Sequence, residues 1–291
     1  MIDGVILKGV GGLYTVDTNT AAGIYMCKPR GIFRKNKISP LVGDMVSISE
    51  TSEGEGVIET IHERRSMLIR PKVANITQAL IVFAYKEPDL HMDLLDRFII
   101  NCEAAGVESI ICLNKTDLIT ESEMEQFEQV KSIYEKAGYT VLAVSTYEGV
   151  NMEAVFNSLK GEITVLAGPS GAGKSSIANM ILDTEMMETG HLSEKIRRGK
   201  HTTRHTQLIR LDEDSYIVDS PGFSSVFFEN IDSGSLKHMF REFREYEGKC
   251  RFLNCNHIDE PDCEIKNQLS LSNISESRYS RYLSLFNEMK G

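Results

Sequence analysis

The chain has 291 residues, of which 41% are hydrophobic and 25% charged, and its formal net charge at pH 7 is -10. Such a length predicts about two domains with room for small modules. The net charge argues against a protein that coats nucleic acid indiscriminately, although local basic patches are compatible with it. The longest apolar run, 79–85, is far too short to cross a bilayer, so we expect no contact with a membrane. The first residues lack a basic segment followed by an apolar stretch, which predicts a cytoplasmic protein.

Residues 1–70 predict a small β-barrel. Short β-branched runs are separated by Gly, Asn, Asp and Pro, and they cover 4–7, 12–16, 23–27, 44–48 and 56–61. This pattern is typical of an OB-like barrel, a fold that commonly binds oligonucleotides. The stretch from Lys28 to Lys37 is basic, contains no acid and includes the aromatic Phe33, a composition that suits phosphate contacts and base stacking. A barrel that only packs on its neighbour is the alternative.

From residue 71 to residue 232 apolar strands alternate with amphipathic helices. Strands are predicted at 76–84, 107–113, 139–144, 163–167 and 215–218, and helices at 90–105, 121–137, 151–159 and 175–183. This alternation predicts a mostly parallel sheet with helices on both faces. Ligands of such sheets bind at the carboxyl ends of the strands, and the motifs of this region lie at those ends.

The strand at 163–167 is followed by a match to the phosphate-binding P-loop, G-x-x-x-x-G-K-[ST], which reads Gly168-Pro169-Ser170-Gly171-Ala172-Gly173-Lys174-Ser175. Glycines let backbone N–H groups curl around a phosphate oxygen, and the N-terminus of the following helix adds partial positive charge. Lys174 is predicted to neutralise the β- and γ-phosphates, and Ser175 to place its hydroxyl on Mg²⁺. Because strand, loop and helix are all present, we predict a nucleoside triphosphate site.

A second motif, Asn114-Lys115-Thr116-Asp117, follows another strand and matches N-K-x-D, the guanine-reading motif of GTPases. The Asp117 carboxylate can accept hydrogen bonds from N1–H and the 2-amino group of guanine. Adenine has a bare acceptor at N1 and no 2-amino group, so the same carboxylate would be left misfitted. Ser145 and Thr146, which follow the next strand, suit the second base-contacting loop. The motif therefore predicts GTP as the nucleotide.

A third motif, Asp219-Ser220-Pro221-Gly222, follows the strand at 215–218 and matches D-x-x-G. We expect Asp219 to be associated with Mg²⁺ and the N–H of Gly222 to meet the γ-phosphate. The basic stretch 195–204 precedes this motif and contains His201-Thr202-Thr203 in the position of a first switch. A threonine there would complete the Mg²⁺ shell, and Thr203 is favoured over Thr202.

The order of the motifs is unusual. Most GTPases run P-loop, switch threonine, D-x-x-G and then N-K-x-D, whereas here N-K-x-D precedes the P-loop. Chain ends usually lie close together on a domain surface, so joining them and cutting elsewhere preserves the sheet and the site. We therefore predict a circularly permuted GTPase domain, whose second switch leads directly into the C-terminal residues.

Residues 233–291 predict a helical zinc-binding module. Helices are predicted at 235–247 and 276–290 from their apolar faces. Between them lie four N/S ligands within fourteen residues, Cys250, Cys255, His257 and Cys263. In a reducing compartment this set suits one structural Zn²⁺ in tetrahedral geometry. A redox cluster and a chance cluster are the alternatives.

The chain resembles the bacterial ribosome small-subunit-dependent GTPase A family along its whole length. The resemblance is carried by the predicted barrel, the permuted order of the GTPase motifs and the spacing of the zinc ligands. The segments that fit its pattern are 30–35, 42–44, 70–71, 114–117, 168–176 (which adds Ser176 to the P-loop), 201–203 and 219–222. The resemblance implies GTP hydrolysis during late 30S maturation that is stimulated by the small ribosomal subunit, and contacts of the barrel and the zinc module with 16S rRNA. We expect a monomer.

The catalytic residue is assigned through this resemblance. Phe223 follows D-x-x-G where a water-orienting Gln often stands, and an apolar side chain cannot position water. The resemblance points instead to His201 in the first switch, acting beside Lys174, with His205 as the competitor. Two other hypotheses stay open: a nucleotide-gated RNA-binding module in which hydrolysis is incidental, and a P-loop ATPase or kinase.

Overall fold

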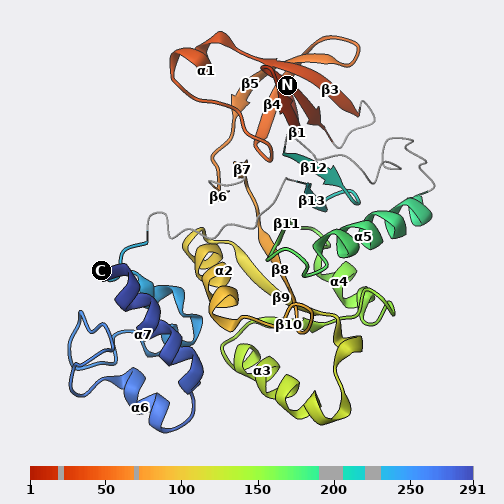
Figure 1. Cartoon of the computed structure of the whole chain (residues 1–291). Coiled ribbons are helices and arrows are strands. Elements are labelled where there is room, and N and C mark those ends of the chain that lie inside the picture. The colour runs from red at the N-terminus through yellow and green to blue at the C-terminus, as the bar shows by residue number, and fades with distance from the viewer. Residues whose placement is uncertain (19–22, 69–71, 190–205, 220–230, 291) are drawn as a thin grey trace.

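The computed structural model describes residues 1–18, 23–68, 72–189, 206–219 and 231–290, with the side chains of Arg34 and 183–189 left aside. Three regions follow one another along the chain (Figure 1). The N-terminal barrel lies at one end of a central sheet, and the C-terminal helices lie beside helix α2 (Met92–Ala104) of the central region. This order matches the predicted architecture.

The N-terminal region is the closed five-stranded barrel that the sequence predicts. Its strands are β1 (Ile2–Val10), β2 (Leu13–Asp17), β3 (Ile24–Pro29), β4 (Met45–Ser52) and β5 (Glu55–Ile61). Antiparallel pairing of β1 with β4 closes the barrel, and β3 pairs with β5 in parallel. Alternate side chains of these strands point inward and form a core of Ile6, Val16, Tyr25, Cys27, Val46, Ile48 and Ile58.

Within the basic stretch 28–37, the residues after β3 form a short helix, α1 (Gly31–Lys35). Phe33 in this helix is partly buried and packs against the barrel core. Its ring therefore contributes to packing inside this molecule. Lys35 and Lys37 are exposed, so the cationic character of the stretch is available at the surface.

Two short antiparallel strands, β6 (Met67–Leu68) and β7 (Val73–Ala74), lie between the barrel and the central sheet along the chain. The central strands run in the order β10 (Thr140–Ala143), β9 (Glu108–Asn114), β8 (Gln78–Ala84), β11 (Ile163–Ala167), β13 (Tyr216–Asp219) and β12 (Gln207–Arg210). All neighbours pair in parallel except β12, which is antiparallel to β13. Strand β12 is absent from the sequence analysis. It also pairs with β1, so barrel strands and central strands form one continuous sheet.

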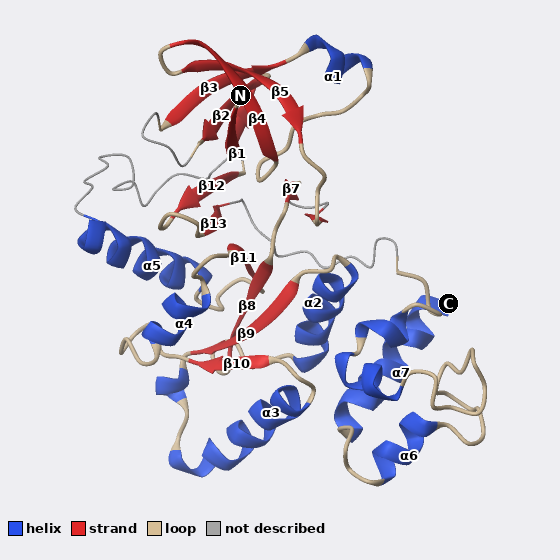
Figure 2. Cartoon of the chain, turned by 180° about the vertical axis from the view of Figure 1, so that it is seen from behind, coloured by secondary structure: helices blue, strands red, loops and turns tan. Residues whose placement is uncertain are grey.

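Helices cover both faces of the central sheet, as predicted (Figure 2). On one face α2 and α3 (Met124–Lys136) bury Leu95, Phe98, Phe127 and Tyr134 in a shared core with the strands. On the other face, α4 (Met152–Ser158) and α5 (Lys174–Thr189) bury Met152, Val155, Ile177 and Ile181 in a second core with the strands. Two short 3₁₀ helices, η1 (Thr116–Leu118) and η2 (Glu121–Glu123), lie between β9 and α3.

The C-terminal region differs from the prediction at its start. The single helix predicted at 235–247 is wrong, because the chain forms two 3₁₀ helices there, η3 (Leu236–Met239) and η4 (Arg241–Tyr246). Phe240 separates them in an extended conformation, with φ -95° and ψ 101°. This break lets the rings of Phe240 and Phe243 stack with their centroids 5.3 Å apart. Both rings also make edge-to-face contacts with the ring of Tyr282. Tertiary packing of the aromatic rings therefore overrides the helical pattern.

Two α-helices complete this region, α6 (Glu264–Ser270) and α7 (Glu276–Lys290). Helix α7 has the predicted bounds, whereas α6 is absent from the sequence analysis. No helix among the described residues is long and apolar enough to pass through a membrane.

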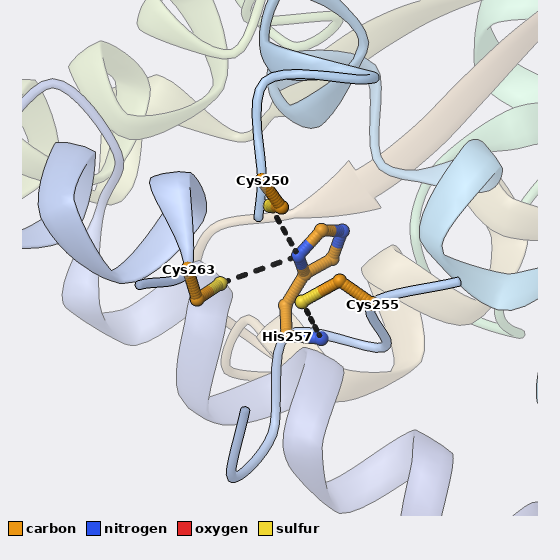
Figure 3. A group of neighbouring side chains, drawn as sticks. All are labelled: Cys250, Cys255, His257 and Cys263. Atoms are coloured by element: carbon orange, nitrogen blue, oxygen red, sulfur yellow. Dashed lines mark hydrogen bonds between the residues drawn. The ribbon is translucent and has the colours of Figure 1, made fainter. Parts of the chain in front are cut away.

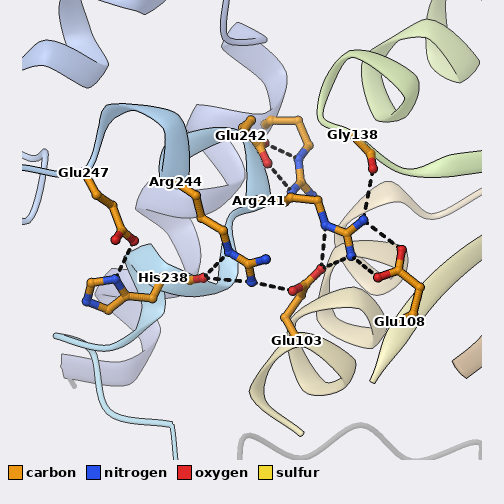
Figure 4. Close-up of polar contacts among 9 residues, drawn as sticks. Glu103, Glu108, Gly138, His238, Arg241, Glu242, Arg244 and Glu247 are labelled. Carbon is orange, nitrogen blue, oxygen red and sulfur yellow. Dashed lines mark hydrogen bonds and ion pairs between the residues drawn. The ribbon is translucent and has the colours of Figure 1, made fainter. Parts of the chain in front are cut away.

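Charged contacts attach the C-terminal region to the central sheet (Figure 4). Arg241 donates to Glu103 at 2.8 Å and to Glu108 at 2.9 Å. The same guanidinium donates to the carbonyl of Gly138 at 3.0 Å. Arg278 of α7 is fully buried and pairs with Asp96 of α2 at 2.6 Å. These contacts hold the C-terminal region against α2.

Candidate nucleotide site and metal centre

The P-loop lies between β11 and α5, and two of its glycines are required by their surroundings. Gly168 has φ +134°, and a Cβ added to it would lie 2.0 Å from the carbonyl oxygen of Val82. Gly173 has φ +95°, and its Cβ would lie 2.1 Å from Nδ2 of Asn114. Both positions combine a backbone conformation that favours glycine with a contact that excludes any side chain. The loop is therefore packed closely on two neighbouring strand ends.

Lys174 begins α5 and lies over the loop. Its Nζ donates to the carbonyl oxygens of Gly168 and Pro169, both at 2.7 Å. Partial burial lowers the pKa of Lys174. A cation above a glycine loop at a helix N-terminus is an arrangement that fits a phosphate chain. Ser175 and Ser176 follow in the first turn and are exposed.

Asn114 ends β9, is fully buried and joins three loops. Its Nδ2 donates to the carbonyl oxygen of Ala172 in the P-loop at 3.0 Å and to Oγ1 of Thr146 at 3.3 Å. Its Oδ1 accepts from the backbone N–H of Thr146 at 3.1 Å. The structure thus brings the N-K-x-D segment, the P-loop and the loop after β10 together, although the chain separates them widely.

Asp117 and Ser145 also come together. The Ser145 hydroxyl donates to Oδ1 of Asp117 and accepts from the N–H of Glu148 at 3.1 Å. Ser145 is fully buried, so its hydroxyl is a fixed donor that orients the carboxylate.

Lys115 reveals a contact that the sequence analysis misses. Its backbone is left-handed, with φ +63°, and its Nζ donates to the carbonyl oxygen of Glu87 in the loop between β8 and α2. In the same loop, Cδ of Pro88 lies close to the P-loop: a Cβ added to Gly171 would be 3.4 Å from it. A fourth loop therefore borders the site. Its residues match no nucleotide motif, so nothing in the local sequence marks them.

Asp219 ends β13, directly beside β11, which leads into the P-loop. One of its carboxylate oxygens, Oδ2, accepts from Nε2 of Gln207 at 3.0 Å. Gln207 is a second residue that the sequence analysis misses. The remaining switch residues lie outside the described part of the chain: His201, Thr202, Thr203, His205, Gly222 and Phe223.

The four predicted zinc ligands form one cluster in the C-terminal region (Figure 3). Their ligand atoms all lie within 4.8 Å of one another. Nδ1 of His257 lies 3.6 Å from Sγ of Cys250 and 3.4 Å from Sγ of Cys263. Sulfur and nitrogen bound to one tetrahedral zinc ion would be about 3.6 Å apart. The donor set and its spacing therefore fit this ion.

Surrounding groups fix the cluster in place. Backbone N–H groups of His257 and Glu264 donate to Sγ of Cys255 and Cys250 at 3.4 and 3.3 Å. The Tyr279 hydroxyl donates to the carbonyl oxygen of His257 at 2.6 Å. Such contacts orient ligands from outside the first coordination shell, and they tie the ligand loop to α7.

Comparison with known proteins places this arrangement in a family. The RsgA GTPase family profile matches residues 61–229, more than half of the chain, and the RsgA N-terminal domain profile matches residues 3–58. The chain belongs to the RsgA GTPase family. As a member it is a GTP hydrolase, and the family implies binding of GTP with Mg²⁺.

Individual RsgA relatives are similar over nearly their full length. A protein of Clostridium perfringens strain SM101 named small ribosomal subunit biogenesis GTPase RsgA is 48% identical over 288 residues, covering 99% of this chain and 98% of its own. The protein of the same name from Agathobacter rectalis is 46% identical over 298 residues, covering 99% and 98%.

Two solved structures share the fold. YjeQ from Thermotoga maritima superposes with a TM-score of 0.86 at 33% identity, covering 100% of this chain and 99% of its own. YloQ, described as a circularly permuted GTPase, superposes with a TM-score of 0.86 at 34% identity, covering 100% and 95%. The predicted permutation is thereby confirmed at the level of the fold.

Proposed function

We propose that this RsgA-family GTPase binds the small ribosomal subunit and hydrolyses GTP during late 30S maturation, and that the subunit stimulates the hydrolysis. The observation that carries the nucleotide part is the hydrogen bond from Asn114 to the carbonyl of Ala172. It places the base-reading segment against the phosphate loop, so one nucleotide can reach both. The relatives' shared name, small ribosomal subunit biogenesis GTPase, supports the ribosomal part.

Each loop has a role in this proposal. The backbone of residues 168–176 and the Lys174 ammonium hold the phosphates. Asp117 accepts from guanine while the Ser145 hydroxyl holds its carboxylate in place. Asn114, Lys115 and Thr146 shape the base pocket through the contacts described above.

The magnesium and water-handling roles are also part of the proposal. Ser175, Thr203 and Asp219 hold Mg²⁺, and bound Mg²⁺ neutralises charge on the β- and γ-phosphates. The backbone N–H of Gly222 donates to the γ-phosphate, and His201 orients the attacking water. Support for Asp219 comes from its position at the end of the strand beside β11. Support for Ser175 and Gly222 comes from the P-loop and D-x-x-G motifs that contain them, and support for Thr203 and His201 comes from their position in the first switch and from the family resemblance.

The two flanking modules are proposed to hold 16S rRNA, and the protein to act as a cytoplasmic monomer. On the barrel, Lys28, Lys35 and Lys37 are exposed around α1, which suits phosphate contacts. On the C-terminal region Arg251 and Phe252 are exposed beside the first zinc ligand.

The decisive experiment is GTP turnover by the purified chain with and without isolated small subunits at fixed salt. We expect slow turnover alone and strong stimulation by subunits. The variant His201→Ala is expected to keep GTP affinity and lose the stimulation. Equal rates with and without subunits would remove the ribosomal proposal, and full stimulation of His201→Ala would remove the catalytic role of that histidine.

We further propose that the Cys₃His cluster holds one structural Zn²⁺. The purified chain is expected to contain one zinc per molecule by elemental mass spectrometry. Cys263→Ala is expected to lose the metal and to unfold the C-terminal region, since such sites contribute folding free energy. Cys27→Ala is the matched control, because Cys27 is buried in the barrel core far from the cluster. Loss of zinc in both variants, or in neither, would contradict the assignment.

A further inference from the structure

Strand β12 lies between the barrel and the GTPase sheet and contacts both (Figure 1). It pairs antiparallel with β13, from Gln207 opposite Asp219 to Arg210 opposite Tyr216. On its other edge Gln207 is bridged to Lys8 of β1. A strand of four residues thus connects the two largest parts of the molecule.

The side chains at the two ends of β12 point to different partners. At one end Nε2 of Gln207 donates to Oδ2 of Asp219 at 3.0 Å. At the other end Nη1 of Arg210 donates to Oδ2 of Asp17 at 3.2 Å, and Asp17 is a barrel residue only 3% exposed. The side chain of Gln207 therefore contacts the GTPase sheet, and the side chain of Arg210 contacts the barrel.

We propose that Gln207 is a positioning residue for Asp219, holding its carboxylate in the orientation that the Mg²⁺–nucleotide site requires. The inference rests on the proposed role of Asp219 at Mg²⁺. A carboxylate at a strand end rotates about its Cβ–Cγ bond, and a donor on one oxygen fixes its plane. Outer contacts of this kind orient metal-associated carboxylates.

The pairing explains why a glutamine on the neighbouring strand suits this task. Gln207 and Asp219 are directly opposite each other in the antiparallel pair, where Cβ atoms are about 5 Å apart. A glutamine amide spans this gap as a neutral donor, so it fixes the carboxylate without neutralising it. A lysine or arginine here would compete electrostatically with the magnesium ion.

The backbone of Gln207 is also bridged to Lys8 of β1. Because β12 pairs with a strand on each of its edges, the position of the donor that meets Asp219 is fixed by the sheet.

The test measures the Mg²⁺ requirement for binding a fluorescent, non-hydrolysable GTP analogue to the full chain. Gln207→Met, which keeps the length of the side chain and removes its donor, is expected to raise the half-saturating Mg²⁺ concentration about tenfold. Gln207→Asn, one methylene shorter, is expected to do the same and serves if the first variant does not fold. Arg210→Met is the matched control on the same strand and is expected to stay within about twofold of the unaltered chain, because Arg210 does not contact the Asp219 carboxylate in any described hydrogen bond.

Asp219→Asn separates this inference from the function it rests on. If Asp219→Asn raises the Mg²⁺ requirement and the folded Gln207 variants do not, Gln207 has only a structural role and the inference is overturned. An equal rise in Arg210→Met also overturns it, because the placement of the strand would then matter and not the amide. If Asp219→Asn itself has no effect, the proposed role of Asp219 fails and the inference fails with it.

Discussion

A single carboxylate, Asp117, is proposed to decide which base this GTPase accepts, and its setting allows a sharp test. Ser145 is fully buried and donates to Oδ1 of Asp117. We expect Asp117→Asn to weaken GTP binding by a factor of 100 or more, because the site then faces guanine with mismatched groups. The amide N–H of the variant can instead donate to the 2-oxo group of xanthine, so affinity for xanthosine triphosphate should rise. Competition against a fluorescent nucleotide measures both affinities, and a parallel loss for both nucleotides would show that the substitution only disturbs the fold.

At Gly173 the exclusion of a side chain is steric as well as conformational. A Cβ there would lie 2.1 Å from Nδ2 of Asn114, which holds the P-loop through the carbonyl of Ala172. Gly173→Ala is therefore expected to lower GTP affinity at least tenfold. Gly161→Ala is the matched control, since Gly161 also has a positive φ, +75°, but faces open space. It should lose only about 1–2 kcal/mol of stability, the cost of a left-handed backbone for a residue with a Cβ. Equal affinity in the two variants would mean that the Asn114 contact does not shape the site.

A contact between two residues of the site can be predicted from the sequence only where a local motif specifies both of them. The meeting of Asn114 with the P-loop follows from the two motifs, since each fixes a loop at the carboxyl end of a parallel strand. The contacts of Gln207 and Glu87 follow from no local pattern. A glutamine beside a carboxylate is specified only by strand pairing, and Lys115 reaches Glu87 through a backbone carbonyl that every residue possesses.

The buried guanidinium of Arg278 joins helices α2 and α7. Its removal is expected to reduce the stability of the protein strongly. Arg278 is fully buried and donates to Asp96 at 2.6 Å and to Glu242 at 2.7 Å. Although burial lowers its pKa, these two carboxylates outweigh burial and hold the pKa of Arg278 well above its usual value. Arg278→Met leaves buried carboxylates with less compensation, so we expect a loss of about 3–5 kcal/mol in the free energy of unfolding.

The control for this substitution is Lys131→Met on α3. Lys131 pairs with Glu128 and Glu135 at 3.4 and 3.5 Å on the surface of one helix, and such pairs contribute about 0.3–0.5 kcal/mol each. Denaturant unfolding, followed by circular dichroism, compares the two variants. Similar losses in both would mean that the Arg278 cluster contributes no more than surface ion pairs.

The periodicity of apolar residues predicts the secondary structure of long segments correctly and fails on short ones. Helix α7 has its predicted bounds because fifteen residues carry a sustained apolar face. The segment 235–247 shows a similar pattern but breaks at Phe240, where two aromatic rings must reach Tyr282. Strand β12 has only four residues, so its existence depends on pairing with β1 and β13, which a local reading does not reveal.

At the scale of the whole molecule, charge is distributed unevenly. The net charge is -10, yet the surface around α1 exposes Lys28, Lys35 and Lys37. An acidic protein that binds RNA must do so through such local patches, because its average field repels phosphates. Figures 1 and 2 place α1 at the end of the molecule opposite α3. These exposed lysines therefore lie at the barrel end of the molecule, where the proposed contacts of the barrel with rRNA would be made.

This arrangement makes the salt dependence of subunit binding a test of the barrel's role. Each phosphate contact made by a cation releases counterions, which contributes roughly 0.7–0.9 to the slope of log affinity against log salt concentration. The double variant Lys35→Gln, Lys37→Gln is thus expected to bind subunits more weakly and to reduce that slope by roughly 1.5. The double variant Lys131→Gln, Lys136→Gln on α3 makes the same change in net charge at the opposite end and should leave the slope unchanged. Co-sedimentation with subunits over a series of salt concentrations measures both. If the Lys35→Gln, Lys37→Gln variant keeps the slope of the unaltered chain, the RNA contacts lie elsewhere than α1. If both double variants reduce the slope equally, net charge, and not a local patch, governs the association.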